Sequence, residues 1–224
     1  MFVTKLTIDI IADFVCPWCY IGGKRLDKAL KILEIDDAKI EWKPYQLDPT
    51  LPKLGRPYES YLKQRLGGAD KVDEIHRQLI ELGKEFEIEF DFEAIEIMPN
   101  TLDAHRVTYW AGQAESDTQT KVAYELFSRF FEQGQDIGET NILTDIAREV
   151  GMRGDVVEKL LETNVDINTM TDDIALAQKI GVQGVPCFII NKKYAIMGAQ
   201  STQQFADAIG QICAGFEPQG SEDR

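Results

Sequence analysis

Two cysteines separated by two residues, Cys16 and Cys19, are the residues of this sequence best suited to chemistry. The alternating apolar segment 5–14 before them predicts a strand, and the apolar spacing after them predicts a helix over 17–33. A cysteine at such a junction lies near unpaired backbone N–H groups and the positive end of the helix dipole, which favour the reactive thiolate. The position therefore predicts Cys16 as a nucleophile.

The rest of the motif Cys16-Pro17-Trp18-Cys19 predicts how such a reaction finishes. Two intervening residues place the Cys19 thiol about one helical turn further on, where it can attack a mixed disulfide on Cys16 and release the partner. Pro17 suits the first helical position. Trp18 has no positive charge with which to stabilise a thiolate, as a histidine would, and we expect it to face the substrate. The motif therefore predicts a less extreme oxidant than a histidine-containing one.

The acidic composition disfavours several other function classes. The chain of 224 residues has 24 Lys plus Arg against 38 Asp plus Glu, a net charge of -14. This charge repels phosphate backbones and anionic headgroups, so we expect neither a nucleic-acid nor a membrane partner. Four cysteines are too few for a secreted disulfide scaffold, and the first residues lack a secretory signal pattern. We therefore expect a cytoplasmic protein.

The predicted elements place strands near both ends of the chain and helices between them. A second strand is expected at 39–46, followed by a proline-rich irregular connector. Helical spacing without strands then dominates up to residue 180, most clearly at Val72, Ile75, Leu79, Leu82 and Phe86. Strand patterns return at 186–190 and 194–198, and a capping box over 201–204 predicts a closing helix.

Three separated segments give the sequence a resemblance to a known family. They are Cys16-Pro17-Trp18-Cys19-Tyr20-Ile21-Gly22, Pro99-Asn100-Thr101-Leu102-Asp103-Ala104-His105-Arg106, and Gly184-Val185-Pro186 with Gly198-Ala199-Gln200. In this order, over residues 5–213, they resemble the FrnE-type, DsbA-like thiol-disulfide oxidoreductases of the thioredoxin superfamily.

The resemblance implies an α/β fold in which a thioredoxin fold is interrupted by a long α-helical insertion domain. We place the first thioredoxin-like part at 1–48, the insertion domain at 49–181 and the second thioredoxin-like part at 182–214. Residues 215–224 are expected to form a disordered tail.

The resemblance also implies which residues form the site. Pro186 would be a cis-proline beside Cys16 and would share in catalysis with the two cysteines. The backbone at Val185 would pair with a peptide or glutathione substrate as an added strand. Asn100 and Thr101 would lie at the substrate site, although both also fit a purely structural role as helix caps.

Three ionisable residues near these motifs are interpreted separately. His105 would support the site from a helix, where a neutral imidazole can relay a proton as Cys19 ionises, and a structural histidine explains it equally well. Asp13 could assist the same transfer, but a solvated loop carboxylate is the favoured interpretation. His76 is expected to be solvent-exposed.

Cys187 is a candidate third thiol, because it directly follows Pro186 where relatives generally have an apolar residue. A second resolving thiol, a glutathionylation target and a metal ligand are the functional interpretations. A small hydrophobic residue in a core strand is the favoured one, since free cysteine is among the most buried residue types.

The leading functional prediction is a thiol-disulfide oxidoreductase that exchanges Cys16 and Cys19 with protein or small-molecule thiols and disulfides. No bound cofactor or metal is expected, and glutathione or another thiol would be a redox co-substrate. One alternative is a glutathione-dependent isomerase or transferase of small aromatic compounds, like the 2-hydroxychromene-2-carboxylate isomerases, which generally have serine in place of Cys16. Another is a non-catalytic metal-binding or interaction module. Monomer and homodimer are both left open.

Overall fold

The structure of the chain is a computed structural model that describes residues 5–114 and 117–215. The predicted disordered tail therefore lies outside the described residues, apart from Gly215. The elements are β1 (Thr7–Ala12), α1 (Pro17–Ile32), β2 (Lys39–Pro44), β3 (Arg56–Pro57), α2 (Tyr58–Leu66), α3 (Ala69–Gly83), a short 3₁₀ turn (Lys84–Phe86), β4 (Ile97–Met98), α4 (Leu102–Ala111), α5 (Thr118–Phe131), α6 (Thr140–Glu149), α7 (Gly154–Leu161), α8 (Ile167–Lys179), β5 (Cys187–Ile190), β6 (Tyr194–Met197) and α9 (Thr202–Cys213).

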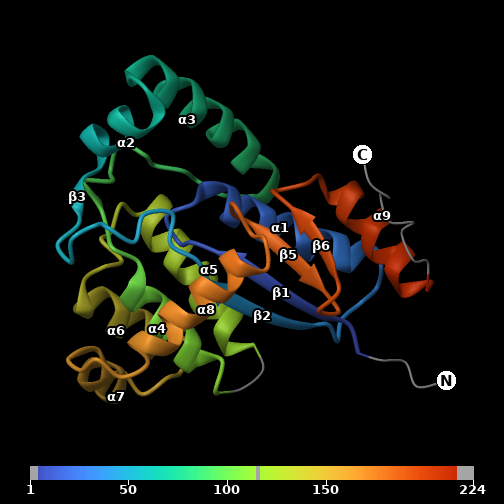
Figure 1. Cartoon of the computed structure of the whole chain (residues 1–224). Coiled ribbons are helices and arrows are strands. Elements are labelled where there is room, and N and C mark those ends of the chain that lie inside the picture. The colour runs from blue at the N-terminus through green and yellow to red at the C-terminus, as the bar shows by residue number, and fades with distance from the viewer. Residues whose placement is uncertain (1–4, 115–116, 216–224) are drawn as a thin grey trace.

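The centre of the fold is a four-stranded mixed sheet in the order β2-β1-β5-β6 (Figure 1). β1 runs parallel to β2, and both β1–β5 and β5–β6 are antiparallel. The register places Ile11 opposite Cys187. The last residues of β1 therefore lie beside the first residues of β5, although the two strands are far apart in the sequence.

The two faces of the sheet are covered by different helices. Ile10 and Phe188 belong to the main core with α1 and α9, where Phe188 and Phe205 pack edge to face with ring centroids 4.7 Å apart. Ile11 and Cys187 point to the opposite face and pack with Ala177 of α8 in a smaller cluster. Burial on both faces is expected of strands that are covered by helices on each side.

The segment between β2 and β5 forms two groups of helices (Figure 1). α2 and α3 lie at the top of the view, and α4, α6 and α7 lie at the lower left. The long helix α5 joins this helical part to the sheet, since Phe127 stacks on Tyr20 of α1 with ring centroids 5.1 Å apart and also contacts Trp42 of β2. The helical segment and the sheet consequently share one continuous hydrophobic core.

Most predicted elements are present, with differences that have physical causes. Helix α1 ends one residue before the predicted end, and Ser201 and Gln204 form the predicted capping box at α9. Helix α2 was not predicted, because it has one fully buried residue, Tyr58, and no apolar stripe. The prediction that the helical segment lacks strands was wrong: β3 and β4 pair over two residues each, too few to show an alternating pattern.

No helix in the described ranges is long and apolar enough to cross a membrane.

Arg106 is a buried cation that holds the end of α7 against α4. Its side chain is 1% exposed and donates hydrogen bonds to the backbone carbonyls of Leu160, Thr163 and Val165, and to Asp103 Oδ1 at 2.7 Å. The carbonyls at a helix C-terminus have no partners within the helix, so a buried cation can satisfy them. The arginine of the second recognised motif is thus explained by its structural contacts.

We expect Arg106→Met to lower the free energy of unfolding by about 3–5 kcal/mol, because it removes the buried cation that pairs with Asp103 and donates to the carbonyls of Thr163 and Val165. Urea denaturation followed by circular dichroism measures the loss. Arg148→Met is the matched control: Arg148 makes the same i,i+3 pair with Asp145 but is 53% exposed, so its loss should stay below about 1 kcal/mol. Equal losses of unfolding free energy in the two variants would contradict the structural role given to the buried Arg106.

Candidate active site

Cys16 lies where β1 ends and α1 begins. It is the N-cap residue of α1, and Pro17 is the first helical residue. The backbone N–H of Cys16 donates to the carbonyl of Asp13 at 3.0 Å, and that of Cys19 donates to the carbonyl of Cys16 at 2.9 Å. Both thiols are free, and Cys16 is 4% exposed. The predicted position of Cys16 at the strand-to-helix junction is confirmed.

Cys19 is the more buried of the two thiols, with none of its surface exposed. Burial raises the pKa of Cys19 well above the ordinary value for a thiol, and the adjacent Cys16 raises it further. A hydrogen bond from the backbone of Asp13 to the Cys19 thiol acts in the opposite direction. Cys19 therefore needs help to lose its proton before it can react as a thiolate.

The loop before β5 lies against the first turns of α1. The Val185–Pro186 peptide bond is cis, and Cys16 Sγ lies 3.8 Å from the carbonyl oxygen of Val185. Gly22 permits this approach, because a Cβ at that position would lie 3.1 Å from both Pro186 Cγ and Phe188 Cζ. Gly22, the glycine of the first recognised motif, is thus favoured by close packing between α1 and the loop.

Two hydrogen bonds hold this loop and its neighbour in place. The backbone N–H of Gly198 donates to the carbonyl of Pro186 at 2.8 Å. Arg25 of α1 donates to the carbonyl of Ala199 at 2.7 Å. The Gly198-Ala199-Gln200 segment therefore braces the Pro186 loop and is itself held by α1.

Asp13 is buried, and its interpretation as a solvated loop residue was wrong. Its side chain is 1% exposed because the segment after β2 folds over the start of α1. Asp13 Oδ2 accepts a hydrogen bond from the backbone N–H of Leu47 at 2.7 Å. Asp13 Oδ1 has no hydrogen-bond partner among the described residues and lies 3.6 Å from His105 Nε2. A buried carboxylate oxygen without a donor is costly and requires an explanation.

His105 lies next to Asp13 and contacts Phe14 and Tyr45. It is buried on α4, its ring lies 4.8 Å from that of Phe14, and its Nε2 lies 2.9 Å from the carbonyl oxygen of Tyr45. A carbonyl oxygen can only accept, so Nε2 carries a hydrogen and donates to it. The resemblance placed His105 beside the redox site, and the structure brings it next to Asp13.

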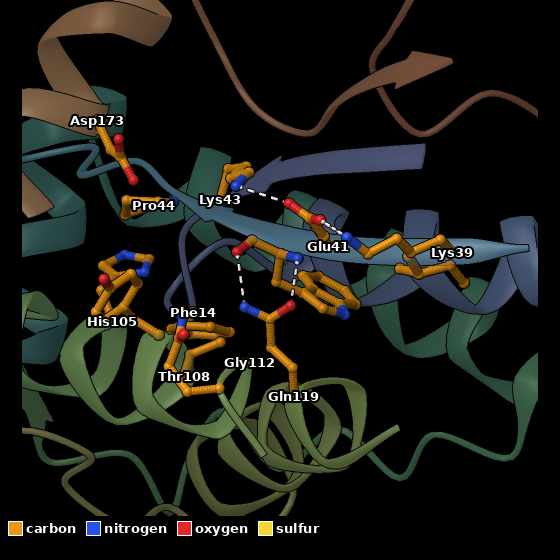
Figure 2. A pocket seen from close by; sticks show the side chains of 14 residues that line it. Phe14, Lys39, Glu41, Lys43, Pro44, His105, Thr108, Gly112, Gln119 and Asp173 are labelled. Carbon is orange, nitrogen blue, oxygen red and sulfur yellow. Dashed lines mark hydrogen bonds and ion pairs between the residues drawn. The ribbon is translucent and has the colours of Figure 1, made fainter. Parts of the chain in front are cut away.

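His105 also lines a second cavity of about 330 Å³ at the outer edge of β2. Figure 2 shows His105 and Thr108 below Pro44 and Lys43 in this cavity, with Asp173 of α8 above them. In the same view, the side-chain amide of Gln119 accepts from the backbone N–H of Trp42 at 3.0 Å and donates to its carbonyl at 3.2 Å. This amide takes the place of a neighbouring strand at the exposed sheet edge.

A cavity of about 330 Å³ opens on Cys16 itself. The Cys16 turn, the segment 47–51, helices α2 and α3, and the segment 98–101 line it. Trp18, Val185 and Thr101 are among the lining residues, whereas Asn100 is not. The structure thus brings Thr101, but not Asn100, to the cavity beside the reactive thiol.

Asn100 serves as a cap and as a brace. Its Oδ1 accepts from the backbone N–H of Leu102, the first residue of α4, at 3.0 Å, and from Gln46 Nε2 at 3.0 Å. Its amide donates to the carbonyl of Leu51 at 2.7 Å. Thr101 is the N-cap residue of α4 by position but makes no capping hydrogen bond with its side chain. The capping role expected of both residues is confirmed only for Asn100.

His76 lies where the sequence did not indicate, whereas Cys187 is buried in a core strand, as its favoured interpretation predicted. His76 was expected to be solvent-exposed, which was wrong: it is half-buried, stacks on Phe92 with ring centroids 4.0 Å apart, and lines the Cys16 cavity. Apolar spacing could not reveal this, because Phe92 lies outside any predicted helix. Cys187 packs with Ile11 and Tyr45 in the small cluster on the α8 face of the sheet.

No group of three or more His, Cys, Asp or Glu side chains within residues 5–114 and 117–215 is arranged to hold a metal ion.

Comparison with known proteins agrees with this architecture. The family model described as the DSBA-like thioredoxin domain matches residues 7–210. The YwbO protein of Bacillus subtilis (strain 168) is 26% identical over 207 residues, which cover 90% of this chain and 94% of YwbO. Both similarities extend over nearly the whole chain.

Solved structures show the same fold. A probable DsbA oxidoreductase, SCO1869 from Streptomyces coelicolor, aligns with a TM-score of 0.86 at 20% identity, covering 98% of this chain and 94% of that one. A 2-hydroxychromene-2-carboxylate isomerase aligns at 0.71 with 15% identity, covering 93% and 97%. The cytosolic disulfide reductase DsbM from Pseudomonas aeruginosa, solved with GSH, aligns at 0.66 with 14% identity, covering 92% and 98%. The chain therefore belongs to the DsbA-like thioredoxin-domain family, which includes oxidoreductases and isomerases.

Proposed function

We propose that this protein is a thiol-disulfide oxidoreductase that exchanges a Cys16–Cys19 dithiol for a disulfide with thiol or disulfide substrates. The observation that carries the proposal is the asymmetry of the pair. Cys16 lies at the N-terminus of α1 and lines a cavity. Cys19 does not line this cavity, and burial raises the pKa of its thiol. This is the arrangement expected of a nucleophile and a resolving thiol.

The reaction follows from this asymmetry. The Cys16 thiolate attacks one sulfur of a substrate disulfide, and the other sulfur leaves as a thiolate that takes up a proton. Cys19 then loses its proton and attacks the Cys16 sulfur, which breaks the mixed disulfide and releases the second substrate thiol. The substrate gains two electrons and the enzyme ends as the Cys16–Cys19 disulfide. The reverse sequence oxidises a dithiol substrate.

The surrounding residues position the substrate for this exchange. The carbonyl of Val185 lines the cavity 3.8 Å from Cys16 Sγ, next to cis-Pro186, and can accept a hydrogen bond from a substrate N–H group. Pro17 fixes the start of the helix, and Trp18 and Thr101 line the cavity that the substrate enters. These roles are consistent with the contacts, which place all of these residues around the Cys16 thiol.

Asp13 and His105 handle the proton of Cys19. Cys19 has no exposed surface, so its proton cannot pass directly to water, and Asp13 lies beside it with one carboxylate oxygen free to accept a proton. His105 Nε2 lies 3.6 Å beyond that oxygen, and its ring lines the cavity of Figure 2. The charged groups around that cavity are Lys39, Glu41, Lys43 and Asp173. Asp13 is thus the acceptor of the Cys19 proton, and His105, whose Nε2 already carries a hydrogen, can return a proton to Asp13 from the edge of β2 when the reaction runs in reverse.

The neighbouring structures bear on the co-substrate and on one alternative. DsbM is a cytosolic disulfide reductase solved with GSH, which supports glutathione or a similar thiol as the partner that restores the resting state, and a cytoplasmic location with net reduction. The likeness to 2-hydroxychromene-2-carboxylate isomerase favours a glutathione-dependent isomerase as the second candidate. Cys16 argues against the second candidate, because a serine generally stands there in those isomerases.

The test of this function is a trapping experiment. In a Cys213→Ser background, which removes an exposed thiol, Cys19→Ser should accumulate a one-to-one mixed disulfide at Cys16 with 2-hydroxyethyl disulfide, because no second thiol can resolve it. Intact-mass spectrometry and peptide mapping identify the adduct. The protein in which both Cys16 and Cys19 are intact should show no adduct once the reaction is complete. The Cys16→Ser variant should not react. An adduct on Cys19, or none on Cys16, would contradict the proposal.

Asp13→Asn tests the proton route, because it keeps the shape of Asp13 and removes the proton acceptor. With 4,4′-dithiodipyridine, the first thiopyridone reports attack by Cys16 and the second reports attack by Cys19. We expect the second phase to slow by about 100-fold at pH 7, and the deficit to shrink as pH rises, since solvent base then deprotonates Cys19.

The control for this experiment is Asp9→Asn, which alters a second buried carboxylate, located on β1 and paired with Lys192. Its second phase should be unchanged. If the Asp13 carboxylate acted only through its negative charge, which raises the pKa of Cys19, the Asn variant would resolve faster at pH 7 than the parent. A faster second phase would therefore overturn the proton-acceptor role.

A further inference from the structure

We propose that the cavity beside Cys16 selects low-molecular-weight thiols and disulfides with an uncharged, flat apolar body such as an aromatic ring. This inference rests on the proposed thiol-disulfide exchange and names the substrate class of the same site. Extended polypeptides and charged thiols such as glutathione would react at Cys16 less efficiently than such compounds.

Access to the Cys16 thiol is restricted. Cys16 is 4% exposed, and the hollow that reaches it is the cavity walled by α2 and α3. Tyr58 and Leu62 of α2, Ile75 and Leu79 of α3, and Trp18 of the Cys16 turn all line this cavity. A substrate sulfur must therefore enter with the body of the molecule between these walls. A volume of about 330 Å³ holds one or two rings and leaves little room for a polypeptide chain.

One wall of the Cys16 cavity is aromatic. Phe92 and His76 stack with ring planes 7° apart, and Tyr58 lies nearly parallel to His76 at an interplanar angle of 13°. Burial lowers the pKa of His76 and raises that of Tyr58, so both rings are uncharged at neutral pH. Because these rings stack on one another, they present uncharged aromatic edges to the cavity, which the face of an aromatic body can contact edge to face.

The charged side chains Asp48 and Arg65 that line the cavity already have partners. Asp48 and Arg65 lie 3.8 Å apart, and Arg65 also donates to the carbonyl of Leu47 at 3.0 Å. Asp48 already accepts from Thr50 and from the hydroxyl of Tyr61. The third lining residue with a full charge, Asp13, would repel an anion. Within the described lining, Arg65 is the only arginine or lysine, so the two carboxylates of glutathione find no free cation.

The experiment compares three disulfides with the reduced protein in the Cys213→Ser background. They are 4,4′-dithiodipyridine (aromatic and neutral), 2-hydroxyethyl disulfide (neutral and aliphatic) and glutathione disulfide (anionic). Each rate constant is divided by that of the same disulfide with free 2-mercaptoethanol, which removes intrinsic reactivity. We expect the normalised rate for the aromatic compound to exceed that for glutathione disulfide by at least about tenfold and to saturate with concentration.

Two tryptophan substitutions on the same helix locate the effect. Ile75→Trp fills the cavity, whereas Ile80→Trp adds the same bulk at an exposed position of α3 outside it. The aromatic preference should fall at least about fivefold in Ile75→Trp and remain in Ile80→Trp. If circular dichroism shows that Ile75→Trp does not fold, Leu62→Glu, on the half-buried part of α2, replaces it by placing a charge in the wall.

Binding of the neutral fluorophore 6-propionyl-2-dimethylaminonaphthalene to Cys16→Ser separates this inference from the proposed function. A blue-shifted, saturable signal that Ile75→Trp abolishes supports the cavity. Binding without exchange of any disulfide by the parent would overturn the proposed function and leave the cavity preference standing. Equal normalised rates for the three disulfides, or equal effects of the two tryptophan variants, would overturn the inference.

Discussion

The antiparallel pairing of β1 with β5 is the interaction on which the site depends. Its register sets Ile11 opposite Cys187, so the segment that follows β1 and the segment that precedes β5 lie side by side. Cys16 belongs to the first segment, and Val185 and Pro186 belong to the second. A slip of this register by one residue would exchange the two faces of β5 and turn Phe188 out of the main core. The position of Cys16 relative to Val185 and Pro186 is therefore fixed by the pairing of β1 with β5.

The segment between β2 and β5 supplies the remaining contacts of the site. The segment after β2 supplies the N–H of Leu47 for Asp13 and the carbonyl of Tyr45 for His105, so one short stretch of backbone orients both groups to which the proposed mechanism gives a role in proton transfer. Helices α2 and α3 then cover the face of Cys16 that the sheet leaves open. In the proposed mechanism, the sheet thus holds the two sulfurs in place, while the helices limit which substrates reach Cys16 and position the residues that accept the proton of Cys19.

Patterns that are local in the sequence predicted their part of this structure well. The strand-to-helix junction at Cys16, the hairpin of β5 and β6, and the capping box of α9 each depend on a few neighbouring residues, and all are present. Features that depend on distant partners were missed. Asp13 is buried because residue 47 folds over it, and His76 is half-buried because Phe92 stacks on it. Neither contact leaves a trace in the spacing of nearby residues, and the same is true of the carbonyls around Arg106.

A redox titration of the purified protein in glutathione buffers tests the central claim most directly. Samples are trapped with acid and alkylated, and mass spectrometry then assigns which cysteines have paired. The account predicts one reversible two-electron transition between the free thiols and the Cys16–Cys19 disulfide, at a potential more reducing than about -120 mV because the motif has no histidine. A pair that never closes, or that gives only glutathione adducts at Cys16, would contradict the dithiol mechanism.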